Sequence, residues 1–238
     1  MGALSQTNGK SFKVDVIVIA RDHEATLGSL LSRLPRRGLR NVIVVDNDSR
    51  DRTGRIAKMG GAVVLREPQH GYGAACRRAL VYLMSLPQPP EVVVFVNGDA
   101  ADDAAQVPVL LEPMKSGHFD LVIGSRVGPS RLSAAEAGKL AAVNLIHAIY
   151  GHRYSDLSPL RAIRYPALVA LGMRDPDWGW LVEMQVKAIT AGLRVAEVAV
   201  RPASEALVPR GGRVARAVDS VCAGGKILFT ILRHATAR

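Results

Sequence analysis

The stretch VVVFVNGDAADD, residues 92–103, joins an apolar run to a group of polar and acidic side chains. Its β-branched residues predict a buried strand over Val92–Val96, and Asn97, Gly98 and Asp99 follow directly. Crowded carboxylates make poor core residues, whereas the carboxyl edge of an α/β sheet is where ligands bind. Oxygen ligands at such an edge suit Mg²⁺, Mn²⁺ or Ca²⁺. The stretch therefore predicts a metal or ligand site, although the first position of this Asp-x-Asp pattern is Asn97.

Similar apolar runs recur on both sides of this stretch and alternate with helical patterns. The expected strands are Val14–Ala20, Asn41–Asp46, Ala62–Leu65, Val92–Val96 and Leu121–Ile123. Helices are expected at about 25–35, 52–59, 73–85 and 105–116. This alternation predicts βαβ units, that is, an α/β fold with a mostly parallel, Rossmann-like sheet and helices on both faces.

The second half of the chain has a more helical pattern. Helices are expected at 134–150, 165–172 and 179–192, and a strand at Arg194–Val200. Residues 202–212, rich in Pro, Gly and Arg, predict a loop, and Val214–Arg233 predicts a helix with one apolar face. That face could dock on the core, or its basic flanks could hold it at a membrane surface.

Bulk properties restrict the class of protein. The 238 residues are 48% apolar and 22% charged, which is ordinary for a soluble globular domain. No apolar run reaches the roughly 18 residues of a membrane-spanning helix, and the N-terminus lacks a secretory signal, so we expect a cytoplasmic protein, or one peripheral to a membrane. Cys76 and Cys222 show neither metal-ligand spacing nor a disulfide framework and are expected to be buried.

The net charge of +10 favours anionic partners such as nucleotides, phosphorylated acceptors or anionic lipid. Residues 201–238 carry seven of the basic residues against two acids. Nucleic acid is not expected as a partner, because few aromatic residues are interleaved with the basic ones.

Several further motifs place polar groups where chemistry can occur. Asp46 ends a predicted strand, where it could accept from a ribose or a base, and Gly71 and Gly73 precede a helix, where backbone N–H groups could face a phosphate. Arg126, in DLVIGSR, could face a phosphate or pair with one of the acids that follow Asp99.

The second half contributes a further set of polar and aromatic residues. Asp156 and Arg161 share the motif YSDLSPLRAIR. Trp178 and Trp180 flank a glycine, and aromatic side chains of this kind often stack on sugars or bases. Glu183 is expected to begin a helix, where the helix dipole would favour its charged form.

Taken in order, these motifs resemble those of GT-A family-2 glycosyltransferases, and most of all the dolichyl- or polyprenyl-phosphate sugar synthases. The resemblance covers about residues 14–232 and rests on the order of seven motifs. These are VIVIARDHEATLG, VIVVDNDSRDRT, REPQHGYGAA, VVVFVNGDAADD, DLVIGSR, YSDLSPLRAIR and GWLVEMQ.

The resemblance implies a role for each matching residue. Donor contacts are implied for Ala20, Arg21, Asp22, Asp46, Gly71, Gly73, Asn97, Gly98 and Asp99, with Asp99 and Asn97 holding a divalent cation, Mg²⁺ or Mn²⁺. Catalytic roles are implied for Arg126, Asp156 and Glu183. The expected acceptor contacts are Arg161, Trp178, Trp180, Arg210, Arg213 and Arg216.

The same resemblance divides the chain into three parts. A flexible N-terminus, 1–12, precedes a GT-A domain, 13–200, which consists of a nucleotide-sugar half, 13–126, and an acceptor half, 127–200. A basic loop and a C-terminal helix, 201–238, complete the chain.

This chain departs from the family pattern at four places. Asp22-His23 replaces an Asn-Glu pair, Asp48 replaces a glycine, Asn97 replaces the first metal-site acid, and Ser158-Pro159-Leu160 replaces the residues after the acceptor-motif acid. An asparagine can coordinate a cation through its carbonyl oxygen but adds no charge, so we expect weaker metal binding.

The expected function is inverting transfer of a hexose from a UDP- or GDP-linked donor to a polyprenyl phosphate, or to another phosphate-bearing or hydroxyl acceptor. A hydroxyl acceptor needs a base, and Asp156 and Glu183 are both candidates. The alternatives are a catalytically silent GT-A domain that binds a nucleotide sugar or acts as a scaffold, and a nucleotidyltransferase, whose glycine-rich loop is absent after the first strand. The sequence is also compatible with a homodimer.

Overall fold

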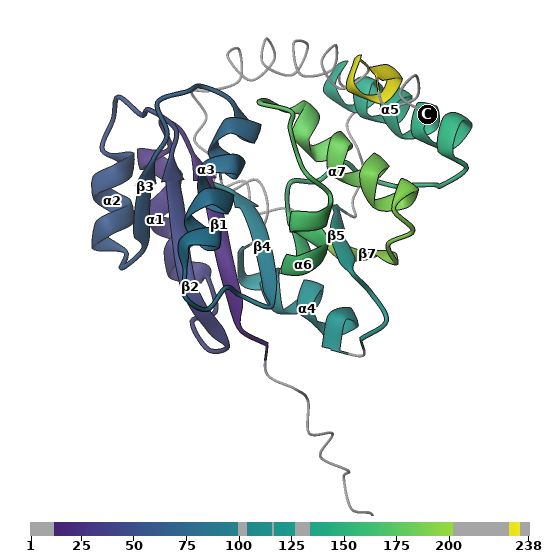
Figure 1. The fold of residues 1–238 in the computed structure, drawn as a ribbon. Helices are drawn as coiled ribbons and strands as arrows, with labels where there is room; N and C mark the ends of the chain where they lie inside the picture. The colour runs from purple at the N-terminus through teal and green to yellow at the C-terminus, as the bar shows by residue number, and fades with distance from the viewer. Residues whose placement is uncertain (1–11, 100–103, 116, 127–133, 202–228, 234–238) are drawn as a thin grey trace, which may run out of the picture.

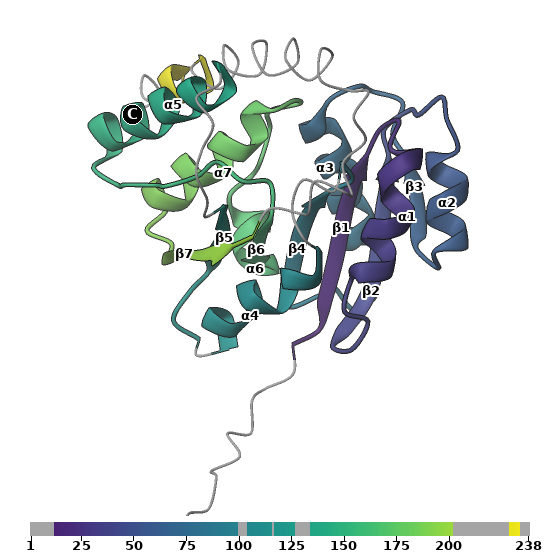
Figure 2. The ribbon, with the colours of Figure 1, turned by 180° about the vertical axis from the view of Figure 1, so that it is seen from behind.

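The structure is a computed structural model that describes residues 12–99, 104–115, 117–126, 134–201 and 229–233. The described part forms one seven-stranded sheet covered by helices on both faces (Figure 1, and from behind in Figure 2). This confirms the predicted α/β class with a mostly parallel sheet.

The strands are arranged in the order β3-β2-β1-β4-β6-β5-β7. All neighbours are parallel except β6, which runs antiparallel to both β4 and β5. The strands are β1 Val14–Ala20, β2 Leu39–Asp46, β3 Val63–Arg66, β4 Val92–Asn97, β5 Leu121–Arg126, β6 Arg161–Arg164 and β7 Val195–Val200.

The helices agree with the predicted patterns to within a few residues. They are α1 Glu24–Arg33, α2 Thr53–Met59, α3 Tyr72–Ser85, α4 Val107–Lys115, α5 Ala134–Tyr150, α6 Tyr165–Ala170 and α7 Gly179–Thr190, with a 3₁₀ turn at Ala104–Gln106 before α4. Residues 229–233 are also helical.

Two apolar layers sandwich the sheet because successive side chains of a strand point to opposite faces. On β1, Val16 and Val18 pack with α1, α2 and α4, whereas Ile17 and Ile19 pack with α3 and with α5 to α7. Strands buried on both faces contain almost only apolar residues, as the runs of β1 and β4 do. Cys76 is buried in the second layer, as predicted.

Strand β6 was missed by the sequence pattern. Two arginines flank its two apolar residues, so nothing local marks RAIR as a strand. It pairs through Ala162 with Val94 and with Val122, and so joins β4 to β5. Because β6 is antiparallel to both neighbours, β5 runs in the same direction as β4, and their carboxyl ends lie at one edge.

Two further expectations concern the second half. The predicted loop at 202–212 and most of the helix expected at Val214–Arg233 lie outside the described residues. Among the described residues, no helix is both long and apolar enough to cross a membrane.

Candidate active site

The polar ends of β1, β2 and β4 meet at the carboxyl edge of the sheet. In the strand registers, Ala20 pairs with Asp46 and Ile19 pairs with Asn97. The ends of these strands and the loops that follow them therefore lie side by side. They contain seven of the residues that the resemblance implies as donor contacts: Ala20, Arg21, Asp22, Asp46, Asn97, Gly98 and Asp99.

The loops after β1 and β2 are bound to each other. The Asp22 N–H donates to Ser49 Oγ (3.0 Å), and Asp22 Oδ1 accepts from the Arg50 N–H (2.8 Å). Asp22 and Asp48 adopt left-handed backbone conformations, with φ of 52° and 58°. Aspartate tolerates this region better than most residues do. The left-handed turn explains why the family pattern has a glycine where this chain has Asp48.

Asp46 has a fixed orientation at the end of β2. Its Oδ1 accepts from the Ser49 N–H (3.0 Å), and α2 approaches it so closely that a Cβ at Gly54 would lie 2.8 Å from Oδ2. The carboxylate is only half-buried, so it can still accept a hydrogen bond from a ligand.

Gly98 allows the turn after β4 to pack against the loop after β1. Its N–H donates to Ile19 O (2.7 Å), and its carbonyl accepts from Thr26 Oγ1 (2.8 Å). A Cβ at this position would lie 2.7 Å from His23 Nδ1 and 2.9 Å from Ala20 Cβ. The flanking Asn97 and Asp99 are both half-buried at this edge.

Few side chains at this edge could bind a metal ion. No group of three or more His, Cys, Asp or Glu side chains with metal-site geometry occurs within the described residues. Asp102 and Asp103 lie outside them. Asp99 and Asn97 supply one carboxylate and one amide oxygen, and oxygen donors of this kind suit a hard cation that also binds diphosphate oxygens and water.

The expectation that N–H groups at Gly71 and Gly73 face a phosphate is wrong for Gly71, whose N–H is already hydrogen-bonded. The Gly71 N–H donates to Asn47 Oδ1 (3.0 Å), and the Ala74 N–H donates to Pro176 O (2.8 Å). A side chain on Gly73 would collide with Asp175 O. The start of α3 therefore packs against residues far along the chain, and Gly71 and Gly73 are both required for that close approach.

Asp156 lies beside the end of β5, at the same carboxyl edge. It is 1% exposed, and its carboxylate pairs with Arg126 (Nε–Oδ2, 3.1 Å) and with Lys139 of α5 (Nζ–Oδ1, 3.6 Å). Arg126 thus pairs with Asp156, a partner that the sequence did not suggest, and the acids at 102 and 103 that were expected as its partners lie outside the described residues. Lys139 was not singled out from the sequence, because no local motif marks its contact.

The surroundings of Asp156 contain further polar groups. Ser125 and Ser155 share a hydrogen bond between their hydroxyls (2.7 Å), and the Glu197 carboxylate accepts from the backbone N–H groups of Ser155 and Asp156. Burial alone would raise the pKa of Asp156, but the hydrogen bonds and charge of Arg126, with Lys139, outweigh it and hold the pKa below its ordinary value. An acid in this environment is a weak proton acceptor.

Glu183 is fully buried inside α7. Its carboxylate accepts from the Arg174 and Asp175 N–H groups (3.0 and 2.7 Å) and pairs with Lys187 Nζ (2.8 Å). Burial raises its pKa, but the Lys187 side chain and these N–H groups outweigh burial and lower it. The carboxylate therefore holds the segment before α7 and does not face open space.

Two residues expected at the acceptor surface are in the interior. Arg161 is 0% exposed, and its guanidinium donates to the carbonyl oxygens of Ser158 and Leu181. Trp180 is 1% exposed and belongs to the core. Their burial corrects the expectation that both face an acceptor, and both instead fix the position of α7. Their neighbour Trp178 is half-buried and stacks on Tyr72, with ring centroids 4.9 Å apart.

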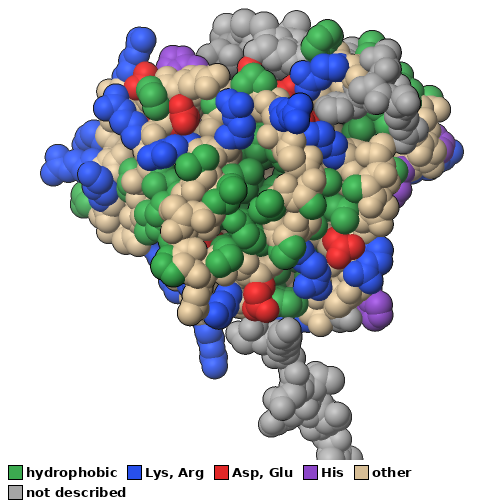
Figure 3. Space-filling view, viewed as in Figure 1, with side chains coloured by type: hydrophobic (Ala, Val, Ile, Leu, Met, Phe, Trp, Pro, Cys, Tyr) green, Lys and Arg blue, Asp and Glu red, His purple; other side chains and the backbone are tan. Residues whose placement is uncertain are grey.

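The other expected acceptor residues, Arg210, Arg213 and Arg216, lie outside the described residues. Figure 3 shows one face of the molecule, where Lys and Arg side chains lie mostly towards the margins and hydrophobic side chains occupy the centre.

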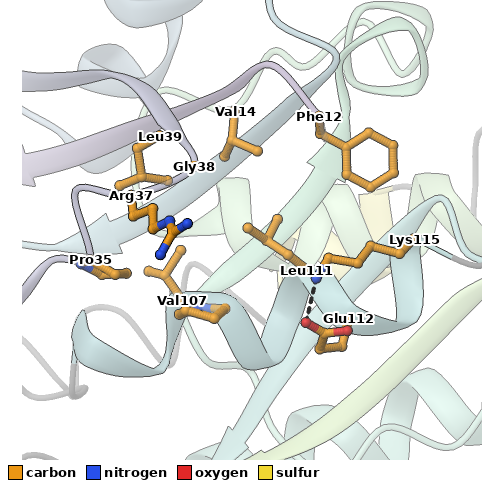
Figure 4. Close-up of a pocket in the computed structure, with 11 residues that line it drawn as sticks. Phe12, Val14, Pro35, Arg37, Gly38, Leu39, Val107, Leu111, Glu112 and Lys115 are labelled. Atoms are coloured by element: carbon orange, nitrogen blue, oxygen red, sulfur yellow. Dashed lines mark hydrogen bonds and ion pairs between the residues drawn. The ribbon is translucent and has the colours of Figure 1, made fainter. Parts of the chain in front are cut away.

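A pocket of about 290 Å³ lies at the opposite edge of the sheet (Figure 4). Val14 and Leu39, at the starts of β1 and β2, line it together with Leu111 of α4. It is far from the carboxyl edge, so it plays no part in the site built from Asp46, Asp99 and Asp156.

A doubly wound sheet with acids and an arginine at one carboxyl edge is typical of α/β proteins that bind a ligand at that edge. Residues 15–154 match the family Glycosyl transferase family 2, and the chain belongs to this family. It is a glycosyltransferase with the GT-A fold.

Relatives and solved structures agree with this assignment. An uncharacterized glycosyltransferase of Mycobacterium tuberculosis is 32% identical over 190 residues, covering 79% of this chain and 84% of that protein. A dolichyl-phosphate hexose transferase of Haloferax volcanii is 30% identical over 224 residues, covering 87% and 92%. The crystal structure of glucosyl-3-phosphoglycerate synthase from M. tuberculosis, in complex with Mn²⁺, UDP and phosphoglyceric acid, superposes with a TM-score of 0.74 at 22% identity, covering 94% of this chain and 78% of that one.

Proposed function

We propose that the protein transfers a hexose, with inversion, from a UDP- or GDP-linked donor to an acceptor whose phosphate oxygen is the nucleophile. The observation that carries this proposal is the pairing of two cations, Arg126 and Lys139, with one buried carboxylate, Asp156, beside the donor edge. Arg126 is 33% exposed and Lys139 is 19% exposed, so part of each side chain is open to solvent.

Two relatives support a phosphate-bearing acceptor. One carries the name dolichyl-phosphate hexose transferase, and the other was crystallised with phosphoglyceric acid. Both acceptors are anionic, and the net charge of +10 in this chain favours ligands of that sign.

On the donor side, we propose that Asp46 accepts from the ribose or the base, with Ala20, Arg21 and Asp22 lining the nucleotide. Gly98 brings the turn of β4 against this loop, which leaves Asp99 next to the place where the diphosphate would lie. Gly71 and Gly73 shape the site from the other side through their packing.

Asp99 and Asn97 would hold a divalent cation, Mg²⁺ or Mn²⁺, and their oxygens fit such an ion. Bound there, it would neutralise charge on the leaving diphosphate, which is often the largest catalytic contribution. The structures of the glucosyl-3-phosphoglycerate synthase contain Mn²⁺ or Mg²⁺ together with UDP, which supports this assignment.

In the proposed reaction, an acceptor phosphate oxygen attacks the anomeric carbon of the hexose. The bond from that carbon to the donor diphosphate breaks, and the nucleoside diphosphate leaves with the electron pair. Arg126 and Lys139 hold the acceptor phosphate in line with this bond, and Asp156 fixes the Arg126 guanidinium.

An ionised phosphate acceptor needs no general base, and the environments of the two candidate bases agree with such an acceptor. Asp156 and Glu183 are buried in ion pairs that lower their pKa values, so neither is placed to accept a proton from a hydroxyl. A lipid-linked phosphate would bring the enzyme to a membrane surface, whereas a soluble phosphate would not.

The donor assignment is tested by calorimetry with UDP and with GDP, each with and without Mn²⁺, together with an assay of donor hydrolysis. Wild-type protein should bind one of the two nucleotides, and Mn²⁺ should tighten binding. Asp99→Ala should lose the effect of Mn²⁺, while Asn97→Asp should keep or increase it. Unchanged Mn²⁺-dependent binding in Asp99→Ala would reject the metal assignment. Binding by the wild type without any turnover would favour a catalytically silent domain instead.

A further inference from the structure

The segment between α6 and α7, residues 174–178, packs against residues 71–73 at the start of α3, which we call the glycine loop. Side chains on Gly71 and Gly73 would collide with the carbonyl oxygens of Pro176 and Asp175 respectively. The Ala74 N–H donates to Pro176 O (2.8 Å). The position of the glycine loop therefore depends on the position of this segment.

The same segment is also bound to α7, through the side chain of Glu183. Glu183 accepts from the N–H groups of Arg174 and Asp175, and Asp175 Oδ1 accepts from the Asp177 N–H (2.9 Å). Trp178, at the end of the segment, stacks on Tyr72, the first residue of α3, with an angle of 18° between the rings. Helix α7 and helix α3 are thus linked through five consecutive residues.

The carboxyl-terminal turn, residues 229–233, reaches the same segment from a distant part of the sequence. Thr230 Oγ1 donates to Asp175 Oδ2 (3.1 Å), and Arg233 Nη2 lies 3.7 Å from that oxygen. Thr230 is 1% exposed, so its hydroxyl is enclosed at this contact. Gly179, at the start of α7, has no room for a side chain, because a Cβ there would lie 2.5 Å from Thr230 Oγ1.

We propose that Asp175 is a positioning residue that couples the carboxyl-terminal turn to the donor site. One carboxylate oxygen shapes the 174–178 segment through Asp177, and the other binds Thr230 and Arg233. Docking of the turn therefore fixes the position of the 174–178 segment, against which Gly71 and Gly73 pack. Through that packing it affects the affinity for the nucleotide. This inference rests on the proposed function, because it assumes that the glycine loop borders the donor.

The coupling is tested with Thr230→Val, which keeps the volume of the buried side chain but removes the donated hydrogen bond. The full-length variant should bind the nucleotide that the wild type binds, UDP or GDP with Mn²⁺, about fivefold more weakly by calorimetry, which corresponds to about 1 kcal/mol. Thr230→Ser restores the hydroxyl and should restore the dissociation constant. Leu232→Ser, on an exposed side of the same turn, should leave it unchanged.

A double-mutant cycle separates positioning from stability alone. If Thr230 acts through Asp175, Thr230→Val should weaken binding much less in an Asp175→Asn background than in the wild type. Nucleotide affinity in Thr230→Val equal to that of the wild type, with or without a lower melting temperature, would overturn the inference and leave the proposed function standing. If the wild type binds neither nucleotide, the proposed function is overturned and the inference with it.

Discussion

The Asp156 carboxylate binds both the side chain and the main chain of Arg126. The guanidinium donates from Nε to Oδ2 (3.1 Å) and from Nη2 to Oδ1 (3.3 Å), and the Arg126 backbone N–H donates to Oδ2 (3.1 Å). A buried acid thus fixes both the main chain and the side chain at the end of β5. In the proposed reaction this pairing restricts Asp156 to orienting the two cations, since a carboxylate whose pKa they lower is a weak proton acceptor.

Asp156→Asn is therefore expected to lower kcat by about tenfold, as a loss of orientation does. Loss of a general base would cost about 100- to 10,000-fold. Because Arg126 and Lys139 keep the pKa of Asp156 below its ordinary value, the wild-type rate should show no rise between about pH 6 and pH 8 from this group. Steady-state rates across that range check both points, and a rate that climbs with pH only in the wild type would identify Asp156 as a base.

Lys139 is expected to contact the acceptor phosphate. Lys139→Gln should raise the acceptor KM by about tenfold, since a hydrogen bond to a charged group contributes about 1.5–3 kcal/mol. The donor KM should stay unchanged. Lys115→Gln is the matched control, because Lys115 pairs with Glu112 at the opposite edge of the sheet. Equal acceptor KM values for wild type and Lys139→Gln would remove Lys139 from the acceptor site.

Gly73→Ala is expected to disturb the donor site and the fold together. The added methyl group would collide with Asp175 O, which belongs to backbone and cannot swing away. Overpacking of this kind destabilises a protein by about 1–3 kcal/mol, and nucleotide affinity should fall in parallel. Gly28→Ala in α1 is the control, because its Cβ would meet Ile56 at an ordinary 3.7 Å. Chemical denaturation and calorimetry measure the two effects, and a fully stable Gly73→Ala would contradict the packing described.

Glu183 should contribute to stability in a pH-dependent way. Its folded pKa lies below the ordinary 4.5, so its contribution is complete above that value and is lost as the pH falls through the folded pKa. Glu183→Gln removes the ion pair with Lys187, which keeps its hydrogen bond to Gly172 O, and should destabilise the protein by about 1.5–3 kcal/mol near neutral pH. The difference in free energy of unfolding from the wild type should shrink between about pH 5 and pH 3. A difference that stays constant over this range would show that the charge of Glu183 does not stabilise the fold.

The sequence predicts the sheet and its helices well where the pattern is local. Runs of β-branched residues such as those of β1 and β4 are typical of strands buried on both faces, and the polar residues that end them lie at the ligand edge. Strand β6 has no such signal, since Arg161 and Arg164 occupy half of it, and its antiparallel insertion depends on pairing with strands far along the chain.

The candidate site is less predictable, because its geometry depends on contacts between distant residues. The occupied N–H groups near Gly71 involve Asn47 and Pro176, and the ion pair of Asp156 involves Lys139 from another helix. One signal was available: Glu183 lies in the apolar run between Trp180 and Val186, which indicates a buried helix and hence a paired carboxylate.

The central claim is that a phosphate oxygen of the acceptor receives the hexose. Mass spectrometry of products formed from the accepted UDP- or GDP-hexose with Mn²⁺ tests it most directly, with a polyprenyl phosphate, the matching polyprenol and 3-phosphoglycerate as parallel acceptors. We predict a hexosyl phosphodiester from the polyprenyl phosphate or another phosphate acceptor, no product from the polyprenol, and a large loss of product in Arg126→Ala. Transfer to the polyprenol, or to the hydroxyl of 3-phosphoglycerate and to no phosphate oxygen, would contradict the account.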